Sequence, residues 1–323
     1  MRNHGWDVEQ VQENDISQWG KMADALTDAT SEGLPDLVLW TRTGWAWEHL
    51  GWSHNEAMSA QALLRVVAGR RHVPVIGYHL DIWWGLKREV EVSTEQFFDV
   101  DILITADGGH DDRWVEAGVN HVWFPPAISA AEAHVGQHRD EFASRIAFVG
   151  SHDGGYHPEH QHRHQLVAWL KTEFGRSGEN AVRFWPEPGQ HAIRGRDLQD
   201  LYASVDVVVG DSAFAGTGLS SYCSDRVPET TGRGGFLLHP RVPGVTDGSL
   251  WRGVPMWTEG ETIACWDAGN WDELRSKIDY YLNNVDQRRE IARAGRALTT
   301  EHHTYERRIA QLEAVLLERG LLR

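Results

Sequence analysis

The stretch "SDRVPETTGRGGFLLHPRVPG", residues 224–244, decides how the fold is interpreted. If Asp225 caps a helix, Pro228 occupies the third helical position, where the backbone N–H has no intrahelical partner and proline costs little. Gly232 and the glycine pair beginning at Gly234 predict the end of this helix, because glycine accepts the left-handed conformation of a helix exit. The stretch therefore predicts a helix of about two turns.

The short helix leads into the apolar run 236–238, which predicts a buried strand. A helix of this length is marginal on its own in water, so we expect it to act as a support. It would hold the side chains of Asp225, Arg226 and Glu229 at one edge of a sheet.

Similar apolar runs recur along the chain and alternate with helical patterns. The first series of predicted strands covers 6–11, 36–40, 73–78, 101–105 and 121–124, and the second covers 146–150, 181–185, 206–210, 235–239 and 262–266. Nearly continuous apolar strands separated by helices predict parallel sheets covered on both faces. We therefore expect an α/β protein with two doubly wound domains.

We place these domains at residues 1–140 and 141–323, with the boundary inside 128–145. The first domain is expected to be abbreviated, because its opening strand and loop are not recognisable before the residues 6–11. The chain closes with long amphipathic helical patterns over 271–284 and 286–318.

Composition narrows the class of protein. Hydrophobic residues make up 41% and charged residues 24% of the 323 positions, as in water-soluble globular proteins. No apolar run is long enough for a bilayer, and the first ten residues lack the apolar segment of a signal peptide, so we expect a cytoplasmic protein. The two cysteines, Cys223 and Cys265, cannot build a disulfide framework and suit a reducing compartment.

Charge and tryptophan content bear on the partners. The net charge is −16; residues 1–140 hold 10 Lys and Arg against 22 Asp and Glu, so this part alone carries −12. Such a charge disfavours a polyanionic partner at long range. Several of the sixteen tryptophans, including Trp83 and Trp84, fall in predicted loops, where a ring can stack on a sugar or base; filling the core is the equally weighted alternative.

The two halves, the segment "IAFVGS" that opens the second (residues 146–151), the segment 224–240 and the tail 280–308 together resemble the GT-B glycosyltransferases. The resemblance is strongest to the group-1 branch that includes CgeB-like proteins, and it covers most of residues 75–310. It implies two Rossmann-like domains facing a cleft, the first binding the acceptor and the second the nucleotide-sugar. It also implies transfer of a hexose, with a UDP-sugar as the expected donor and no metal or other cofactor required.

Under this resemblance, Glu229 matches the family's glutamate that binds the ribose hydroxyls, a task that suits a carboxylate because it accepts two hydrogen bonds from a vicinal diol. Many relatives have an earlier glutamate eight positions before, where this chain has Ser221. Arg226 and Arg233 are candidates for the diphosphate. For Arg226, a surface ion pair with Asp225 is the alternative.

Other donor contacts are expected from loops that follow strands. Gly150 and Ser151 offer backbone amides to phosphate oxygens, and Asp211 and Ser212 end a predicted strand where ligands gather. Arg194 is a further candidate, with a solvated loop arginine as the alternative. The full predicted donor-binding set is Gly150, Ser151, Arg194, Asp211, Ser212, Arg226, Glu229, Arg233 and Gly234.

In the first domain, Asp81 and His79 follow an apolar strand and are the predicted catalytic residues, with Asp81 favoured as the base. An inverting enzyme needs such a base, whereas a retaining one does not; the alternative is that Asp81 caps the next turn. The predicted acceptor-binding residues are Trp83, Trp84, Asp107 and His110, the last two also being the reserve choice for the base. A metal site at the alternating His160, His162 and His164 is not expected, because a helical pattern follows and would scatter them.

The sequence does not identify the acceptor. The abbreviated first domain and the high Trp and His content look like glycosyltransferases encoded by phages, some of which decorate hydroxylated DNA bases. A hydroxymethylated base is therefore the most specific expectation. Protein, lipid and small-molecule acceptors, and a non-catalytic nucleotide- or sugar-binding module, are the alternatives.

Overall fold

The computed structural model describes residues 1, 5–10, 21–22, 24, 26–27, 34–41, 54–80, 82–152, 161–175, 181–187 and 189–322. The chain forms two compact units, one of Met1–Phe124 with Ile309–Arg323 and the other of Pro125–Arg308. The division therefore falls before the expected boundary at residue 140. The reason is that the segment after Phe124 is bound into the second unit: Gln137 N donates to Asp200 Oδ1 (2.7 Å) and Arg139 N to Ser204 Oγ (2.8 Å).

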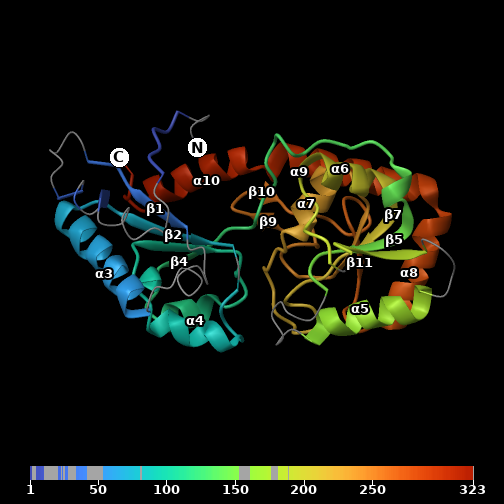
Figure 1. Cartoon of the computed structure of the whole chain (residues 1–323), viewed down its shortest axis with the longest axis horizontal. Coiled ribbons are helices and arrows are strands. Elements are labelled where there is room, and N and C mark those ends of the chain that lie inside the picture. Colours follow the sequence, from blue (N-terminus) through green and yellow to red (C-terminus); the bar gives the residue numbers. More distant parts are fainter. Residues whose placement is uncertain are drawn as a thin grey trace. The chain divides into compact units, whose positions relative to one another are not determined.

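The first unit is built on a parallel four-stranded sheet in the order β1-β2-β3-β4 (Figure 1). Its strands are β1 (Val38–Thr41), β2 (Val75–His79), β3 (Ile102–Thr105) and β4 (His121–Trp123), and its helices are α3 (His54–Arg71), α4 (Asp111–Glu116) and the 3-10 turns η2 (Lys87–Ser93) and η3 (Gln96–Phe98). Residues 6–10 form no strand, so the prediction of one at 6–11 is wrong in its described part. Trp6 instead donates its indole N–H to Glu313.

The second unit contains a parallel five-stranded sheet in the order β11-β8-β7-β5-β6. Its strands are β5 (Ser144–Val149), β6 (Val182–Trp185), β7 (Val205–Val209), β8 (Leu237–Pro240) and β11 (Ala264–Trp266); β9 (Leu250–Trp251) and β10 (Val254–Pro255) form a separate antiparallel pair. The helices are α5 (Gln161–Phe174), α6 (Gly195–Ser204), α7 (Arg226–Gly232), α8 (Trp271–Asn283) and α9 (Val285–His302), with the 3-10 turn η4 (Asp140–Phe142). Figure 1 shows α5 on one face of this sheet and α6, α7 and α9 on the other.

Both faces of the second sheet are apolar, as the continuous apolar strands predict. One face packs Ile146, Phe148, Val207 and Val209 against apolar residues of α5 and α8. No helix in the described part of the chain is long and apolar enough to cross a membrane.

The pattern expected to form one helix over 286–318 is divided between α9 and α10 (Tyr305–Glu318). Ile128 causes the break: its N–H donates to the carbonyl of His303 (3.1 Å), and Tyr305 N donates to its carbonyl (2.9 Å). These bonds take the backbone groups that would continue the helix. The part of α10 after Arg308 belongs to the first unit.

The decisive stretch folds as expected into α7 and the buried strand β8. Pro228 is the third residue of α7, and Gly234 has a φ of 77° just past its end. The expected cap is wrong in one respect, because the side chain of Asp225 makes no capping hydrogen bond.

Small residues join α7 to α9 along a close seam. Thr231 Oγ1 lies 2.7 Å from Thr299 Oγ1, and a Cβ on Gly232 would approach Ile128 Cγ2 to 2.9 Å. On α9, a Cβ on Gly295 would stand 2.3 Å from the carbonyl oxygen of Thr262. Only glycine fits beside this carbonyl, and a Cβ on Gly295 would also lie 3.5 Å from Thr231 Cγ2 of α7, so α9 packs closely against both segments.

We expect Gly295→Ala to lower the free energy of unfolding by about 3 kcal/mol, because backbone must move to admit the methyl group. Helix propensity alone would favour alanine by about 1 kcal/mol, so the sign of the change reports the contact. Urea denaturation measures it, with Glu290→Ala on the exposed side of α9 as control. Equal or higher stability of Gly295→Ala would contradict the close seam.

Two buried histidines make the second unit sensitive to acid. Burial lowers the pKa of His239 to about 4. Burial, and then the charge of Arg308, lower that of His303 to about 3. The partners of His303 explain the direction: Arg308 Nη2 donates to its Nδ1 (2.7 Å) and its Nε2 donates to the carbonyl of Pro255 (2.9 Å), so a second ring proton would displace Arg308.

Stability should therefore fall as the pH falls. Both imidazoles titrate near 6.5 when unfolded, so below this pH the unfolded chain takes up protons that the folded chain refuses until about pH 4 and 3. The two neutral rings make their full contribution to the free energy of unfolding above pH 6.5. As the pH falls below this value, that free energy decreases by up to about 1.4 kcal/mol per pH unit for each ring. Urea midpoints between pH 7 and 4.5 measure this slope. His303→Gln should be less stable at pH 7 with a shallower slope; an unchanged slope would contradict the assignment.

Candidate functional site

The candidate donor site lies at the carboxyl edge of the second sheet. The strand order brings β5 beside β7 at the point where the chain reverses its progress across the sheet, and ligands of such sheets bind outside the carboxyl ends of the strands at this point. Gly150 and Ser151 follow β5, and Asp211 and Ser212 follow β7 shortly after it ends. Gly150 has a φ of 151°, a conformation that favours glycine.

Arg226 and Glu229 of α7 join this edge. Arg226 Nη1 donates to Glu229 Oε2 (2.9 Å) and to the hydroxyl of Tyr202 (3.3 Å), and a Cβ on Gly150 would lie 3.1 Å from Arg226 Nη2. The structure thus brings Gly150, Arg226 and Glu229 together. The ion pair that it shows for Arg226 is with Glu229, not the predicted one with Asp225.

Arg226 is positively charged in this position. Burial lowers its pKa, but the neighbouring Tyr202 and Glu229 more than offset that effect and raise the pKa above its usual value. A guanidinium with remaining N–H groups beside a glycine turn is suited to phosphate oxygens. The partly exposed carboxylate of Glu229 beside it is suited to a diol.

Asp211 is held by residues that the sequence analysis did not assign to the site. His162 Nδ1 lies 2.8 Å from its Oδ1, and Arg163 Nε donates to its Oδ2 (2.9 Å). Burial raises the pKa of Asp211, but these two partners outweigh it and lower the pKa below the usual value. Asp211 is thus a buried, ionised anchor between β7 and α5. Ser212 is also buried, and its Oγ accepts from Phe214 N (3.3 Å), so both shape the loop.

Three other predicted donor residues do not join the group. Arg233 is buried, pairs with Glu132 and donates to the carbonyl of Glu229 (3.1 Å), so its charge is used within the fold. Gly234 lies with Ser144, the first residue of β5, at the opposite edge of the sheet. Arg194 is exposed at the start of α6. These placements correct the prediction for Arg233 and Gly234 in particular.

Ser221, at the position where the family resemblance predicts a glutamate, takes part in backbone packing. It has a φ of 62°, and its N–H donates to the carbonyl of Pro243 (2.8 Å). A Cβ on Gly244 would lie 2.7 Å from Ser221 Oγ, so the position is closely packed.

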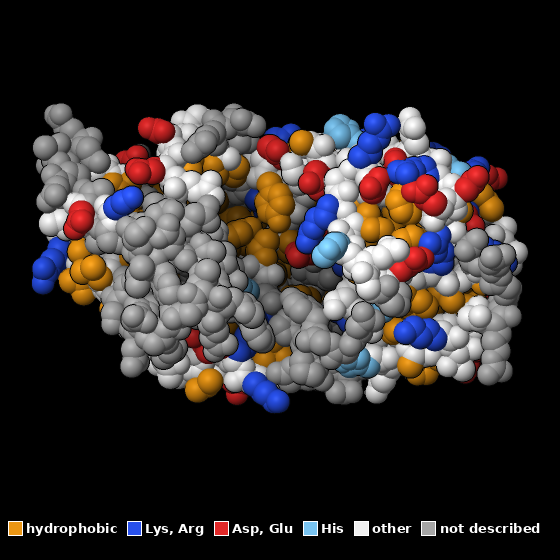
Figure 2. Space-filling model, viewed as in Figure 1, with side chains coloured by type: hydrophobic (Ala, Val, Ile, Leu, Met, Phe, Trp, Pro, Cys, Tyr) orange, Lys and Arg blue, Asp and Glu red, His pale blue; other side chains and the backbone are white. Residues whose placement is uncertain are grey.

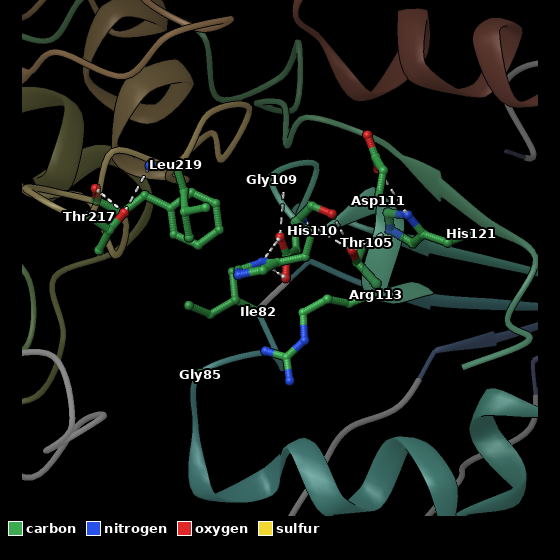
Figure 3. A network of polar contacts seen from close by, with 12 residues as sticks. Ile82, Gly85, Thr105, Gly109, His110, Asp111, Arg113, His121, Thr217 and Leu219 are labelled. Atoms are coloured by element: carbon green, nitrogen blue, oxygen red, sulfur yellow. Dashed lines mark hydrogen bonds and ion pairs between the residues drawn. The ribbon is translucent and has the colours of Figure 1, made fainter. Parts of the chain in front are cut away.

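In the first unit, Asp107 and His110 form a pair at the carboxyl end of β3. Figure 3 shows His110 with Gly109 and Thr105 in this region. Asp107 is fully buried and accepts from His110 Nδ1 (2.9 Å) and Gly109 N (3.3 Å). Because a carboxylate can only accept, His110 carries its proton on Nδ1 and has the lone pair on Nε2.

Further polar contacts fix this strand end. Thr105 Oγ1 accepts from Asp107 N (3.0 Å) and lies 2.8 Å from His121 Nε2. The His121 ring stacks on Trp114 with centroids 4.7 Å apart. The dyad of Asp107 and His110 is therefore built on a rigid strand end.

The other predicted residues of the first unit have different surroundings. Asp81 lies outside the described residues, and His79 ends β2 with its ring 5.0 Å from that of Trp83. Trp83 and Trp84 are 1% and 9% exposed, and Arg88 and Arg113 cover their rings at 4.4 and 4.3 Å. The prediction that they stack on an acceptor is not supported by this burial, because the loop folds back over the core.

Among the described residues, no group of three or more His, Cys, Asp and Glu side chains is arranged to hold a metal ion. His162 and His164 lie in α5, and His160 is outside the described residues.

Known structures with the same two-domain fold are glycosyltransferases. A glycosyltransferase from Rickettsia africae is similar with a TM-score of 0.55 and 11% identity over 97% of this chain and 84% of that one. HepE from Anabaena in complex with UDP-glucose gives 0.57 and 12% over 98% and 87%. An α-glucosyltransferase in complex with UDP and a 13-mer DNA gives 0.60 and 10% over 94% and 83%. The expected α/β fold with two Rossmann-like domains is thus confirmed as GT-B.

Fold and sequence point to the same class: the chain has the GT-B fold of these glycosyltransferases. More narrowly, residues 159–314 match the family described as "Glycosyl transferase-like", a range that includes Asp211, Arg226 and Glu229. Comparison with curated protein sequences finds no match. A CgeB-like or phage branch stays a prediction from the sequence.

Proposed function

We propose that the protein transfers a hexose from a UDP-sugar to a hydroxyl acceptor. The observation that carries the proposal is the group of Gly150, Arg226 and Glu229 at the reversal point of the second sheet. HepE from Anabaena, which has the same fold, has been solved with UDP and glucose and with UDP-glucose. Its ligands support UDP as the nucleotide to test first.

In this proposal each member of the group has a separate task. Glu229 accepts hydrogen bonds from the ribose hydroxyls, and the charged Arg226 contacts the diphosphate. The amides that follow Gly150 receive phosphate oxygens. As the bond to the sugar breaks, negative charge grows on the leaving diphosphate, and Arg226 stabilises it in place, so transfer is accelerated.

The acceptor hydroxyl is assigned to the carboxyl edge of the first sheet. His110, oriented by Asp107, accepts a hydrogen bond from that hydroxyl at Nε2 and takes its proton if the reaction inverts the anomeric carbon. His79 and Asp81 follow the neighbouring strand and stay proposed partners in this task.

The most specific acceptor that we propose is a hydroxymethylated base in phage DNA. An α-glucosyltransferase of the same fold has been solved with DNA that contains an HMU base, which supports this choice. The charge of −16 acts against it, although acidic and basic groups alternate on the described surface of Figure 2 rather than forming one acidic field. Protein, lipid and small-molecule hydroxyls are the competing acceptors.

One experiment tests donor and acceptor together. The protein is incubated with UDP-glucose and duplex DNA containing 5-hydroxymethylcytosine or 5-hydroxymethyluracil, and the DNA is analysed by mass spectrometry. A gain of one hexose on modified but not on unmodified DNA supports the proposal. If UDP-glucose is bound or hydrolysed but no DNA product forms, the donor assignment is retained and the DNA acceptor is rejected. Absence of any UDP binding rejects the donor assignment as well.

Glu229→Ala should weaken UDP binding about 30-fold, because two hydrogen bonds from the ribose to a carboxylate are lost. Calorimetry with UDP and with 2′,3′-dideoxy-UDP compares ligands with and without the two ribose hydroxyls. Only UDP affinity should change, and the melting temperature should stay close to that of the wild type, because the side chain is partly exposed. Unchanged UDP affinity would remove Glu229 from the donor site.

A further inference from the structure

A second polar hollow lies at the opposite edge of the same sheet, where β5 and β7 begin. Its volume is about 660 Å³. The first residues of both strands, Ser144 and Val205, line it together with the end of α6 and the first turns of α9. The donor group is at the carboxyl ends of these strands, so the hollow is separate from it.

The lining of this hollow is positively charged in an acidic protein. Three arginines, Arg145, Arg288 and Arg289, line it together with one carboxylate, Asp206. Arg288 is buried, pairs with Asp206 and donates Nη1 to the carbonyl of Tyr281 (2.9 Å). Arg145 and Arg289 are exposed and have no carboxylate partner among the described residues.

The three guanidiniums are close enough to repel one another. Burial lowers the pKa of Arg288, Asp206 acts in the opposite direction, and the charges of Arg289 and Arg145 add to the lowering. At the wall of the hollow, the buried Oγ of Ser144 has no hydrogen-bond partner in the described part of the chain. His138 also lines the hollow, 3.3 Å from Asp140.

We propose that this hollow binds the phosphate group of a small phosphorylated molecule. Guanidinium N–H groups match phosphate oxygens in pairs, and a phosphate would neutralise the excess charge of Arg145 and Arg289. The volume is in the usual range of small-molecule sites, which favours a compact ligand over an extended polymer. Arg288 is held in place by Asp206, so part of the site is formed before binding.

The hollow has a direct contact with the donor site through Tyr202. Its ring lines the hollow, and its hydroxyl accepts from Arg226 Nη1 (3.3 Å). Test variants therefore leave Tyr202 intact, so that a change at the hollow is not confused with damage to the donor site.

The test is a calorimetric titration of the full chain with inorganic pyrophosphate in the presence of excess UDP. The wild type should bind pyrophosphate under these conditions, and the double variant Arg145→Gln, Arg289→Gln should bind it at least tenfold more weakly. The double variant Arg70→Gln, Arg196→Gln, which changes exposed arginines of α3 and α6, is the charge-matched control and should bind as the wild type does. UDP affinity, measured on the same samples, should be equal in all three.

The outcomes separate this site from the donor site. Loss of UDP binding in Glu229→Ala with intact pyrophosphate binding supports two sites. Absence of pyrophosphate binding in the presence of UDP, or equal binding by the double variant, overturns the proposal. A duplex DNA titration is the last arm: if the double variant loses DNA affinity but keeps pyrophosphate affinity, the arginines bind nucleic acid and the small-molecule site is rejected.

Discussion

Arg226→Gln is expected to lower kcat by about 10²–10³-fold, a loss typical of removing one donor from a developing charge. In the structure Arg226 reaches from α7 to Gly150, and Glu229 and Tyr202 keep its guanidinium charged and oriented. The effect should be greater on kcat than on UDP affinity, because the charge on the diphosphate grows as the sugar leaves. Steady-state kinetics with the UDP-sugar and calorimetry with UDP measure the two effects.

Two further variants separate chemistry from folding. Arg226→Lys keeps the charge but loses the paired N–H groups, so its kcat should lie between those of the wild type and Arg226→Gln. Arg196→Gln removes an exposed arginine of α6 and should leave kcat unchanged. Equal kcat in Arg226→Gln and the wild type, with both folded, would show that another group stabilises the leaving diphosphate.

Local rules predicted the short helix and the strands around it well. In the sequence, Pro228 marks the first turn of α7 and the glycines among residues 232–235 mark its end. The structure has the helix at the same place. The nine apolar runs that became strands β1–β8 and β11 needed no long-range contact to be recognised. Each of these signals lies within a few residues of the feature that it predicts.

The misplaced features depend on contacts between distant residues. Ile128 breaks the last helical pattern at His303, and no spacing in the sequence connects the two. His162 and Asp211 form a buried pair across α5 and β7 in the same way. Arg233 was predicted as a phosphate ligand because the sequence shows its charge. The sequence does not show that Glu132 pairs with it in the fold.

Burial explains the remaining error at the candidate site. Trp83 and Trp84 follow a strand, and a loop tryptophan is an attractive stacking surface. Their rings turn back into the core beside Phe98 and Trp114, and arginines cover them. The sequence shows which residues follow a strand. It does not show which of these side chains are then buried in the core.

His110→Ala is expected to lower kcat by about 10²-fold or more with UDP affinity unchanged, because the residue acts on the acceptor and not on the donor. Asp107 is fully buried and accepts from His110 Nδ1 (2.9 Å), which fixes the tautomer in which Nε2 is the acceptor. Kinetics with saturating UDP-sugar and varied acceptor measure the loss. Asp112→Asn, an exposed change on the adjacent helix α4, is the matched control and should have no effect.

The pH profile decides whether His110 acts as a base or only orients the acceptor. As a base it must be unprotonated, so kcat/KM in the wild type should fall on the acidic side, and this limb should disappear in His110→Gln. Asp107→Asn tests the positioning: it should reduce kcat less than His110→Ala does, because the imidazole is kept and only the carboxylate that fixes its tautomer is lost. If His110→Gln keeps both kcat and the limb, the dyad serves the structure of the first unit. The acceptor proton then leaves by another route, as a transfer that retains the anomeric configuration requires no side-chain base.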